Sequence, residues 1–248
     1  MHFRLLTYNI HKGIGGTDRR YRLERIVEVL KHCQPDIALL QEVDEEVPRS
    51  NRDRQVELLA DAAGLHHYAF QRNVRLKRGG YGNAILSRFP LTDLHNIDLT
   101  IRFKKLRIKK HRRALVAHCH ILLKGHTRSL VVANLHLGLS GIERQIQLRR
   151  LLESPSIART HNSTPMVIGG DYNDVWGKLG TGILQPVGFN SVGGNIRTFP
   201  AALPIRSLDR IYYRNLVQTR PAFASRTRVA HQASDHLPLV VDLEIPWS

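Results

Sequence analysis

The sequence is poor in the features that stabilise small secreted domains or anchor membrane proteins. Only two of its 248 residues are cysteines, Cys33 and Cys119, which excludes both a disulfide framework and a closely spaced metal-binding pair. No apolar run reaches the roughly 18 residues of a membrane-spanning helix. The first residues also lack the charged and then apolar pattern of a secretory leader. We therefore expect a soluble, cytoplasmic protein.

Acidic residues are scarce relative to basic ones. The sequence has 21 Asp and Glu against 37 Lys and Arg, which leaves a formal net charge of +16. Such a surface attracts polyanions, including nucleic acid, anionic membranes and phosphorylated metabolites, but the same charge also simply keeps basic proteins in solution. The charge thus indicates a class of partner without identifying one.

One stretch concentrates this charge. The 12 residues from Arg102 to Arg113 include eight Lys or Arg and no acid, interleaved with isoleucine, phenylalanine and leucine. This pattern predicts a basic hairpin or loop with one side anchored to the protein and the other free to follow a phosphate backbone. Solvated loop charges or attraction to an anionic lipid surface are the alternatives. The sequence has no amphipathic membrane helix, which favours nucleic acid over lipid.

Length and patterning predict a single α/β (α+β) domain over residues 1–248. The hydrophobic content of 42% can fill one large core, and no repeat or linker divides the chain. Helical spacing predicts helices at 22–33, 55–63 and 142–152. Apolar runs predict strands at 3–8, 37–40, 84–87, 115–123, 130–135, 166–169, 208–213 and 237–243. Because strands outnumber helices and often follow one another directly, the sheets should be mixed or antiparallel.

Polar residues of the types that bind metals and phosphates recur where these apolar runs end. Glu42 follows the run at 37–40, so its carboxylate should emerge at the edge of a buried sheet, where an unpaired charge is costly. Mg²⁺ prefers one or two carboxylates with waters and phosphate oxygens, which suits Glu42 assisted by the amide of Asn9. A tetrahedral zinc site fits less well, because the histidines lack close pairing.

Two further segments combine acids with an amide or an imidazole. Asp171 and Asn173 follow the run at 166–169, where a carboxylate can accept a proton from water while the amide holds a phosphate oxygen. His236 needs a carboxylate on its other ring nitrogen to stabilise its cation. Since adjacent strand residues point to opposite faces, Asp209 is a better partner for His236 than Asp235 is.

Seven short motifs stand in order along the chain, from Thr7 to Pro238. They are Thr7-Tyr8-Asn9-Ile10, Leu40-Gln41-Glu42-Val43, Tyr81-Gly82-Asn83-Ala84-Ile85-Leu86-Ser87, Asn134-Leu135-His136, Gly170-Asp171-Tyr172-Asn173, Leu208-Asp209-Arg210-Ile211 and Ser234-Asp235-His236-Leu237-Pro238. In this order they resemble the motifs of the endonuclease/exonuclease/phosphatase superfamily, which includes DNase I, exonuclease III type AP endonucleases, neutral sphingomyelinases and inositol polyphosphate 5-phosphatases. The resemblance implies a DNase I-like, four-layer sandwich of two mixed, mostly antiparallel β-sheets flanked by helices.

The resemblance also implies catalytic roles. Asp171 matches the residue that orients or deprotonates the attacking water, and Asn173 matches one that contacts the scissile phosphate. His236 matches a phosphate-contacting histidine paired with an acid at Asp209, and His136 matches a histidine that protonates the leaving group in some members.

The binding residues follow from the same resemblance. Glu42 matches the principal ligand of a Mg²⁺ or Mn²⁺ ion, with Asn9 and Asp235 near the metal. The residues expected against the substrate are Arg112, Arg113, Asn134 and Tyr81, with the choice between the two arginines left open.

The sequence therefore predicts a metal-dependent phosphodiesterase, a nuclease that hydrolyses DNA or RNA by in-line attack of activated water. The first alternative is a phospholipid or inositol-phosphate phosphoesterase of the same superfamily, and the second is a non-catalytic nucleic-acid-binding protein. We expect nucleic acid as the partner, with anionic phospholipid as the alternative, no obligate protein partner, and a monomer.

Overall fold

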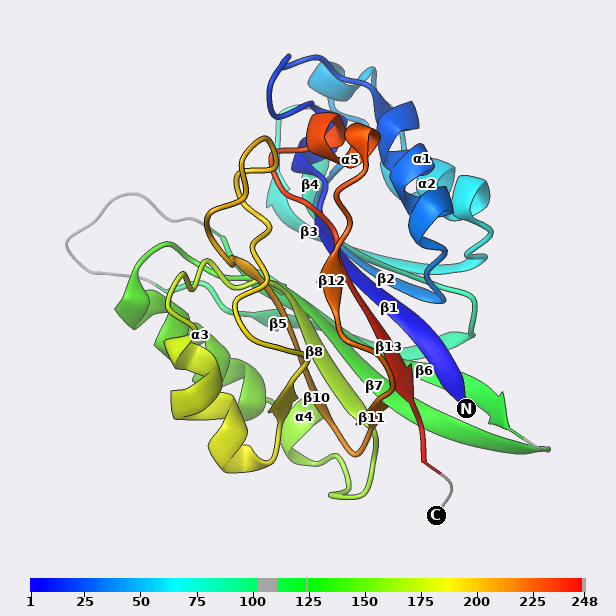
Figure 1. Ribbon diagram of the computed structural model, residues 1–248, viewed down its shortest axis with the longest axis vertical. Helices are drawn as coiled ribbons and strands as arrows, with labels where there is room; N and C mark the ends of the chain where they lie inside the picture. Colours follow the sequence, from blue (N-terminus) through cyan, green and yellow to red (C-terminus); the bar gives the residue numbers. More distant parts are fainter. Residues whose placement is uncertain (102–110, 124, 247–248) are drawn as a thin grey trace.

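The computed structural model describes residues 1–101, 111–123 and 125–246 (Figure 1). Most of the basic stretch noted in the sequence, residues 102–110, lies outside the described residues, so the hairpin or loop expected there stays a prediction. Residues 111–113, at the end of that stretch, are described and reach the candidate site discussed below.

Two mixed β-sheets form the centre of the fold. In spatial order the first contains β11 (Val217–Gln218), β13 (Leu239–Glu244), β1 (His2–Asn9), β2 (Ile37–Glu45), β4 (Gly80–Ser87) and β3 (His67–Arg75), with β12 (Phe223–Ala224) also paired to β13. The second contains β5 (Leu91–Asp98), β6 (Arg113–Leu123), β7 (His126–His136), β8 (Met166–Asp171), β10 (Asp209–Arg214) and β9 (Asn190–Ser191). Strands β1 and β2 are parallel, as are β7 and β8, whereas the other named pairs are antiparallel. The expected mixture, mostly antiparallel, is confirmed.

Helices cover the outer face of each sheet. Helices α1 (Leu23–Cys33), α2 (Gln55–Ala63) and α5 (Arg228–Ala233) cover the first sheet, while α3 (Gly141–Leu152) and α4 (Pro155–Ala158) cover the second (Figure 1). Short helical turns in the connections are η1 (His11–Gly13), η2 (Pro48–Ser50), η3 (Gly180–Leu184) and η4 (Gln185–Val187). The outcome is the four-layer α+β sandwich expected from the sequence.

The alternation of side chains along the strands explains this layering. Leu5 lies in the apolar layer between the sheets, whereas its neighbour Leu6 faces the helices of the first sheet. In the second sheet Val132 lies between the sheets and Val131 faces the opposite helix layer. Each sheet is therefore largely apolar on both faces, and many of the polar side chains that reach the space between the sheets lie toward the ends of strands.

The apolar patterns of the sequence do not predict two of the long strands. In β3 the inward positions include Gln71 and Asn73, which are buried but polar, so no apolar alternation marks the strand. Strand β5 is an edge strand whose residues are mostly exposed. In both strands pairing with a neighbour, rather than an apolar pattern, maintains the extended conformation.

The ends of the described chain lie side by side, far from the carboxyl end of β1. The Met1 amino group donates a hydrogen bond to the carbonyl of Ile245, and the Ile245 amide donates one to the carbonyl of Met1, each at 2.9 Å. Within the described ranges, no helix combines the length and the apolar character needed to cross a membrane.

Candidate active site

Three strands of the second sheet bring a histidine and two acids into one row. Strand register places His136 directly beside Asp171, and Asp171 directly beside Asp209. All three side chains lie on the face that looks toward the first sheet, and all are at most 5% exposed. His136 Nε2 lies 3.5 Å from Asp171 Oδ2. The motifs that carry these residues therefore converge because their strands end side by side.

His236 approaches this row from the segment before β13. Its Nδ1 pairs with Asp209 Oδ2 at 2.8 Å, and its Nε2 lies 3.8 Å from Asp171 Oδ2. The Thr198 hydroxyl donates a second hydrogen bond to Asp209 Oδ2 at 2.5 Å. The partner of His236 is thus Asp209, as the strand argument expects, and Asp235 lies elsewhere.

The two histidines of the site have opposite charge states. Burial lowers the pKa of His236, but the adjacent Asp209 carboxylate outweighs it and, with Asp171, raises the pKa to about 10. Burial, reinforced by the Arg112 guanidinium, lowers the pKa of His136 well below its ordinary value. At neutral pH the site therefore combines an imidazolium at His236 with a neutral imidazole at His136.

Asp171 lies between the two rings and has the properties of a general base. Burial raises its pKa to about 6, assisted by the negative Asp209, while the positive His236 acts in the opposite direction. Its Oδ1 accepts a hydrogen bond from the Asn173 amide at 2.9 Å, and its Oδ2 accepts one from Asn9 Nδ2 at 3.2 Å. A carboxylate with a pKa just below neutrality is mostly ionised at pH 7 and still basic enough to accept a proton.

Glu42 comes from the first sheet and occupies a bulge. The register of β2 with β4 shifts between Leu40 and Val43, and Glu42 has a φ of 55°. Leu40 and Val43 both face the helix layer although they are three residues apart, so the alternation changes phase at this point. Without the bulge, Glu42 would follow Leu40 by two residues and face the helices as well.

The Glu42 carboxylate contacts the Lys12 ammonium of turn η1. Burial raises the pKa of Glu42, but Coulomb attraction to Lys12, and to His136 when that ring is protonated, outweighs burial and lowers the pKa to about 2. Since His136 is itself neutral at pH 7, Lys12 is the cation that keeps Glu42 ionised.

Asn9 connects the two halves of the site. Its Nδ2 donates to Asp171 in the other sheet, while its Oδ1 accepts a hydrogen bond from the His11 backbone at 3.1 Å. Asp235 lies beside the same turn, with its Oδ1 3.9 Å from His11 Nδ1. The metal role of Asp235 therefore stays a prediction, whereas Asn9 joins β1 of the first sheet to Asp171 of the second.

The donor set suits a magnesium-type ion better than a caged metal. Among the described residues, no group of three or more His, Cys, Asp or Glu side chains is arranged to hold a metal ion. Mg²⁺ needs only one or two protein carboxylates and keeps several waters, and the ionised Glu42 with the amide oxygen of Asn9 offers ligands of that type. The ammonium already at Glu42 shows that this carboxylate accepts a positive partner.

The structure distinguishes the two arginines. Arg112 is only 8% exposed, and its charge lowers the pKa of His136, so it lies near the row formed by His136, Asp171 and Asp209. Arg113 Nη1 instead donates to the backbone carbonyl of Arg72 at 3.4 Å. Arg113 lines a cavity of about 410 Å³ together with Arg72, Asn73, Val74, Arg75 and His111.

Asn134 is the one expected substrate contact that the structure reassigns. Its side chain is fully buried. Its Nδ2 donates to the backbone carbonyls of Leu40 and Ala84, each at 2.8 Å, and its Oδ1 accepts from Gln41 Nε2 at 2.8 Å. Asn134 therefore joins β7 to the first sheet beneath the site, and the expectation that it contacts the substrate is wrong because its polar atoms are already occupied.

Asn173 and Tyr81 keep positions compatible with substrate contact. Asn173 Nδ2 donates to the Leu137 carbonyl at 3.0 Å and retains a second N–H. The Tyr81 ring centroid lies 5.9 Å from Lys12 Nζ, beside the Glu42 carboxylate. Sequence reasoning did not pair Lys12 with Glu42 and missed Thr198, which has no motif to mark it.

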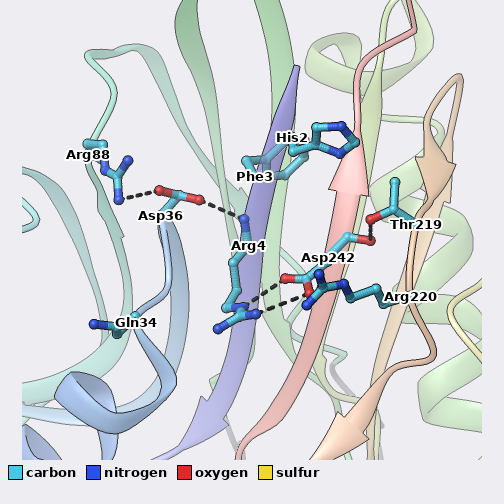
Figure 2. A pocket seen from close by; sticks show the side chains of 9 residues that line it. All are labelled: His2, Phe3, Arg4, Gln34, Asp36, Arg88, Thr219, Arg220 and Asp242. Atoms are coloured by element: carbon cyan, nitrogen blue, oxygen red, sulfur yellow. Dashed lines mark hydrogen bonds and ion pairs between the residues drawn. The ribbon is translucent and has the colours of Figure 1, made fainter.

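A second cavity, of about 600 Å³, lies at the opposite end of the first sheet (Figure 2). Its charged groups are largely paired with one another. Arg4 forms two bonds to Asp242, at 2.7 and 3.1 Å, and Arg88 lies 2.6 Å from Asp36. The first pair connects β1 to β13, and the second connects the residue after β4 to the residue before β2, so the charged groups of this cavity join strands to one another.

A buried acid–histidine row facing an ionised glutamate across two packed sheets defines a hydrolase of the phosphoesterase class. The sequence model of the Endonuclease/Exonuclease/phosphatase family matches residues 6–236, and the chain belongs to that family. Its relatives include "Uncharacterized protein YbhP" of Escherichia coli (strain K12), which is 31% identical over 98% of this chain and 96% of its own length.

Solved structures agree on the fold. An endonuclease/exonuclease/phosphatase from Beutenbergia cavernae superposes with a TM-score of 0.82 at 22% identity, over 98% of this chain and 71% of that one. ANGEL2, described as a 2',3'-cyclic phosphatase, superposes with a TM-score of 0.69 at 18% identity, over 99% of this chain and 96% of that one. The sandwich architecture is thus shared well beyond the range of sequence similarity.

Proposed function

We propose that this hydrolase is a metal-dependent phosphodiesterase that cleaves nucleic acid. The observation that carries the proposal is the position of Asp171 between an imidazolium and a neutral imidazole, with Nε2 atoms 3.8 and 3.5 Å from its Oδ2. A base held beside a fixed positive charge suits the attack of water on a phosphate, where negative charge grows on the phosphate oxygens.

Each residue then has a defined part in the reaction. Asp171 orients the water and accepts its proton, because its pKa of about 6 lies close to the working pH. The His236 imidazolium, the free N–H of Asn173 and the Arg112 guanidinium stabilise charge on the phosphate oxygens. A divalent ion held by Glu42 and Asn9 would supply Lewis-acid activation of the phosphate.

The charge states also assign the proton for the leaving group. The resemblance gave this role to His136, but a neutral imidazole with a lowered pKa carries no readily donated proton at neutral pH. His236 carries such a proton on Nε2 and faces the same carboxylate. We therefore assign proton donation to His236 and treat His136 as the neutral group that borders Asp171.

The basic cavity beside the site favours a polynucleotide over a small ester. Arg113 connects it to the catalytic row, since it follows Arg112 directly. Strand register sets Tyr81 opposite Val74, so the cavity lies across Tyr81 from Glu42. A second phosphate of a nucleic-acid strand has a cationic place to bind there.

The test is a substrate panel with the full chain. Plasmid DNA, single-stranded DNA and RNA, phosphatidyl substrates and a chromogenic phosphomonoester are incubated with Mg²⁺, Mn²⁺ or EDTA. We expect metal-dependent cleavage of nucleic acid, abolished by Glu42→Gln and unaffected by Glu28→Gln, an equivalent change on the exposed face of α1. Release from lipid or monoester alone would favour the phospholipid or inositol-phosphate alternative, and binding without turnover would favour the non-catalytic one.

The cavity has its own test. Binding of a labelled single-stranded oligonucleotide is measured in EDTA across salt concentrations. Arg75→Gln combined with Arg113→Gln should weaken binding and reduce the slope of log K against log salt by about one per lost phosphate contact. Arg149→Gln, on exposed α3, is the matched control. An unchanged slope would remove the cavity from the substrate path.

A further inference from the structure

Turn η1 has a backbone conformation that few sequences adopt. His11, Lys12 and Gly13 have consecutive φ values of 45°, 65° and 74°. Positive φ is uncommon outside glycine, and two neighbouring non-glycine residues in this region occur only where the surroundings impose them. The surrounding structure therefore imposes the conformation of this turn, and the turn directs the Lys12 side chain toward Glu42.

Several contacts hold this turn in place. Gln55, a fully buried residue of α2, donates from Nε2 to the Lys12 carbonyl at 2.8 Å. The His11 amide donates to Asn9 Oδ1, and a Cβ on Gly13 would lie 2.8 Å from Tyr21 Cε2. The backbone at Lys12 is therefore fixed by buried neighbours, while the four-carbon side chain beyond it has rotatable bonds of its own.

Glu42 meets Lys12 from an equally unusual position. It has a φ of 55° at the bulge of β2, so both partners of the ion pair project from left-handed backbone. The side chains of Lys12 and Glu42 are only 17% and 19% exposed, and the centroid of the Tyr81 ring lies 5.9 Å from the Lys12 ammonium nitrogen. An ion pair between mobile surface side chains would need none of this geometry.

We propose that Lys12 is a tethered counter-ion that competes with a divalent cation for the Glu42 carboxylate. The inference rests on the proposed function only in taking Glu42 as the metal ligand. An ammonium in contact with a carboxylate oxygen repels a second cation at the same oxygen, so metal binding requires the Lys12 side chain to rotate away. In the metal-free protein Lys12 keeps the carboxylate ionised and in place.

Displacement of Lys12 also couples the metal to the substrate. The backbone stays fixed, so the displaced ammonium remains near Glu42, where it can form an ion pair with a substrate phosphate. A phosphate that binds Lys12 therefore makes Glu42 more available to the metal, and by linkage the metal makes Lys12 more available to the phosphate. Lys12 thus acts as a positioning residue for metal and phosphate together.

The test measures Mn²⁺ binding to the full chain by electron paramagnetic resonance, without substrate. Lys12→Met should tighten Mn²⁺ binding at least about fivefold, within the usual range of such couplings. Lys12→Arg, which restores a cation, should return the affinity toward wild type. Lys31→Met, the same change on exposed α1, should have no such effect. Thermal melts confirm that each variant is folded.

A second measurement repeats the titrations with dimethyl phosphate, a diester anion. The anion should tighten Mn²⁺ binding more in the wild type than in Lys12→Met. Equal or weaker Mn²⁺ binding by a folded Lys12→Met would overturn the proposal. If Glu42→Gln leaves Mn²⁺ binding intact, the metal assignment of the proposed function fails as well. If Glu42→Gln abolishes binding while Lys12→Met does not tighten it, only the Lys12 proposal is lost.

Discussion

The two sheets contribute different chemistry to one site. The second sheet supplies His136, Asp171 and Asp209 from strand ends in perfect register, so their positions follow from regular pairing. The first sheet supplies Glu42 and Lys12 from a bulge and a left-handed turn, where regular pairing is interrupted. Regular strands thus place the residues to which we assign acid–base chemistry in the proposed function, and irregular backbone places Glu42, the proposed metal ligand, and Lys12. We therefore expect substitutions in the two sheets to have different measurable effects.

The largest effect should come from the second sheet. Asp171→Asn removes the base while leaving an isosteric side chain that can still accept from the Asn173 amide. We expect turnover to fall by about two to four orders of magnitude with the fold intact. The measurement is kcat on the preferred nucleic-acid substrate, with circular dichroism as the folding control. Near-normal turnover would remove Asp171 from the mechanism.

The next largest effect should be a loss of folding stability when the contact between the sheets at Asn134 is removed. Asn134→Ala removes the side-chain donor to two buried carbonyls, those of Leu40 and Ala84, and the acceptor of one of the three hydrogen bonds that Gln41 Nε2 donates. Each unpaired buried polar group costs about 1–3 kcal/mol, so a total loss of about 2–4 kcal/mol is reasonable after relaxation. Urea unfolding measures it. Ser129→Ala, on the same strand but hydrogen-bonded to His118, should cost little stability. Similar unfolding midpoints for both variants would contradict a stabilising role for Asn134 between the sheets.

A smaller effect is expected from the acid that supports His236. Asp209→Asn removes the charge that raises the His236 pKa to about 10. We expect kcat/KM to fall about 10- to 100-fold, and the alkaline limb of its pH profile to move toward neutrality because the imidazolium is lost at lower pH. A limb that stays in place would show that another group controls the alkaline side.

The smallest effect belongs to the ion pairs remote from the site. The Arg4 guanidinium lowers the pKa of Asp242, so Asp242 contributes stability above its unfolded pKa, and this contribution is lost as the pH falls through the folded value. The pair borders an open cavity, so Asp242→Asn should cost less than about 1 kcal/mol at pH 7. The difference from wild type should shrink below about pH 4, and activity should not change. Unfolding at several pH values checks this, with the exposed Asp61→Asn as control.

Much of the second-sheet side could be predicted from sequence. Asp171 and Asp209 close apolar runs that are strands, and the alternation of strand residues correctly separated Asp209 from Asp235 as the partner of His236. These inferences hold because regular strands obey a period of two. The long helices and the central strands could also be predicted, because their apolar patterns are strong.

The rest depended on departures from regularity. A bulge changes the direction of Glu42 without any local signal in its sequence, and nothing marked Lys12 as its partner. Arg112 and Arg113 could not be separated because the alternation rule begins only where β6 begins. Asn134 was misassigned because a motif shows that a residue accompanies a site, not whether it faces the substrate or the opposite sheet.

The path of the chain through the sandwich has a consequence for its synthesis. The first sheet begins with β1 to β4, the chain then builds the whole second sheet, and it returns to complete the first with β11 to β13. Until β13 pairs with β1, a growing polypeptide lacks both His236 and the strand that covers the exposed edge of β1. An unfinished chain on the ribosome therefore lacks the proposed catalytic histidine, and the candidate site is complete only when the last strand is in place.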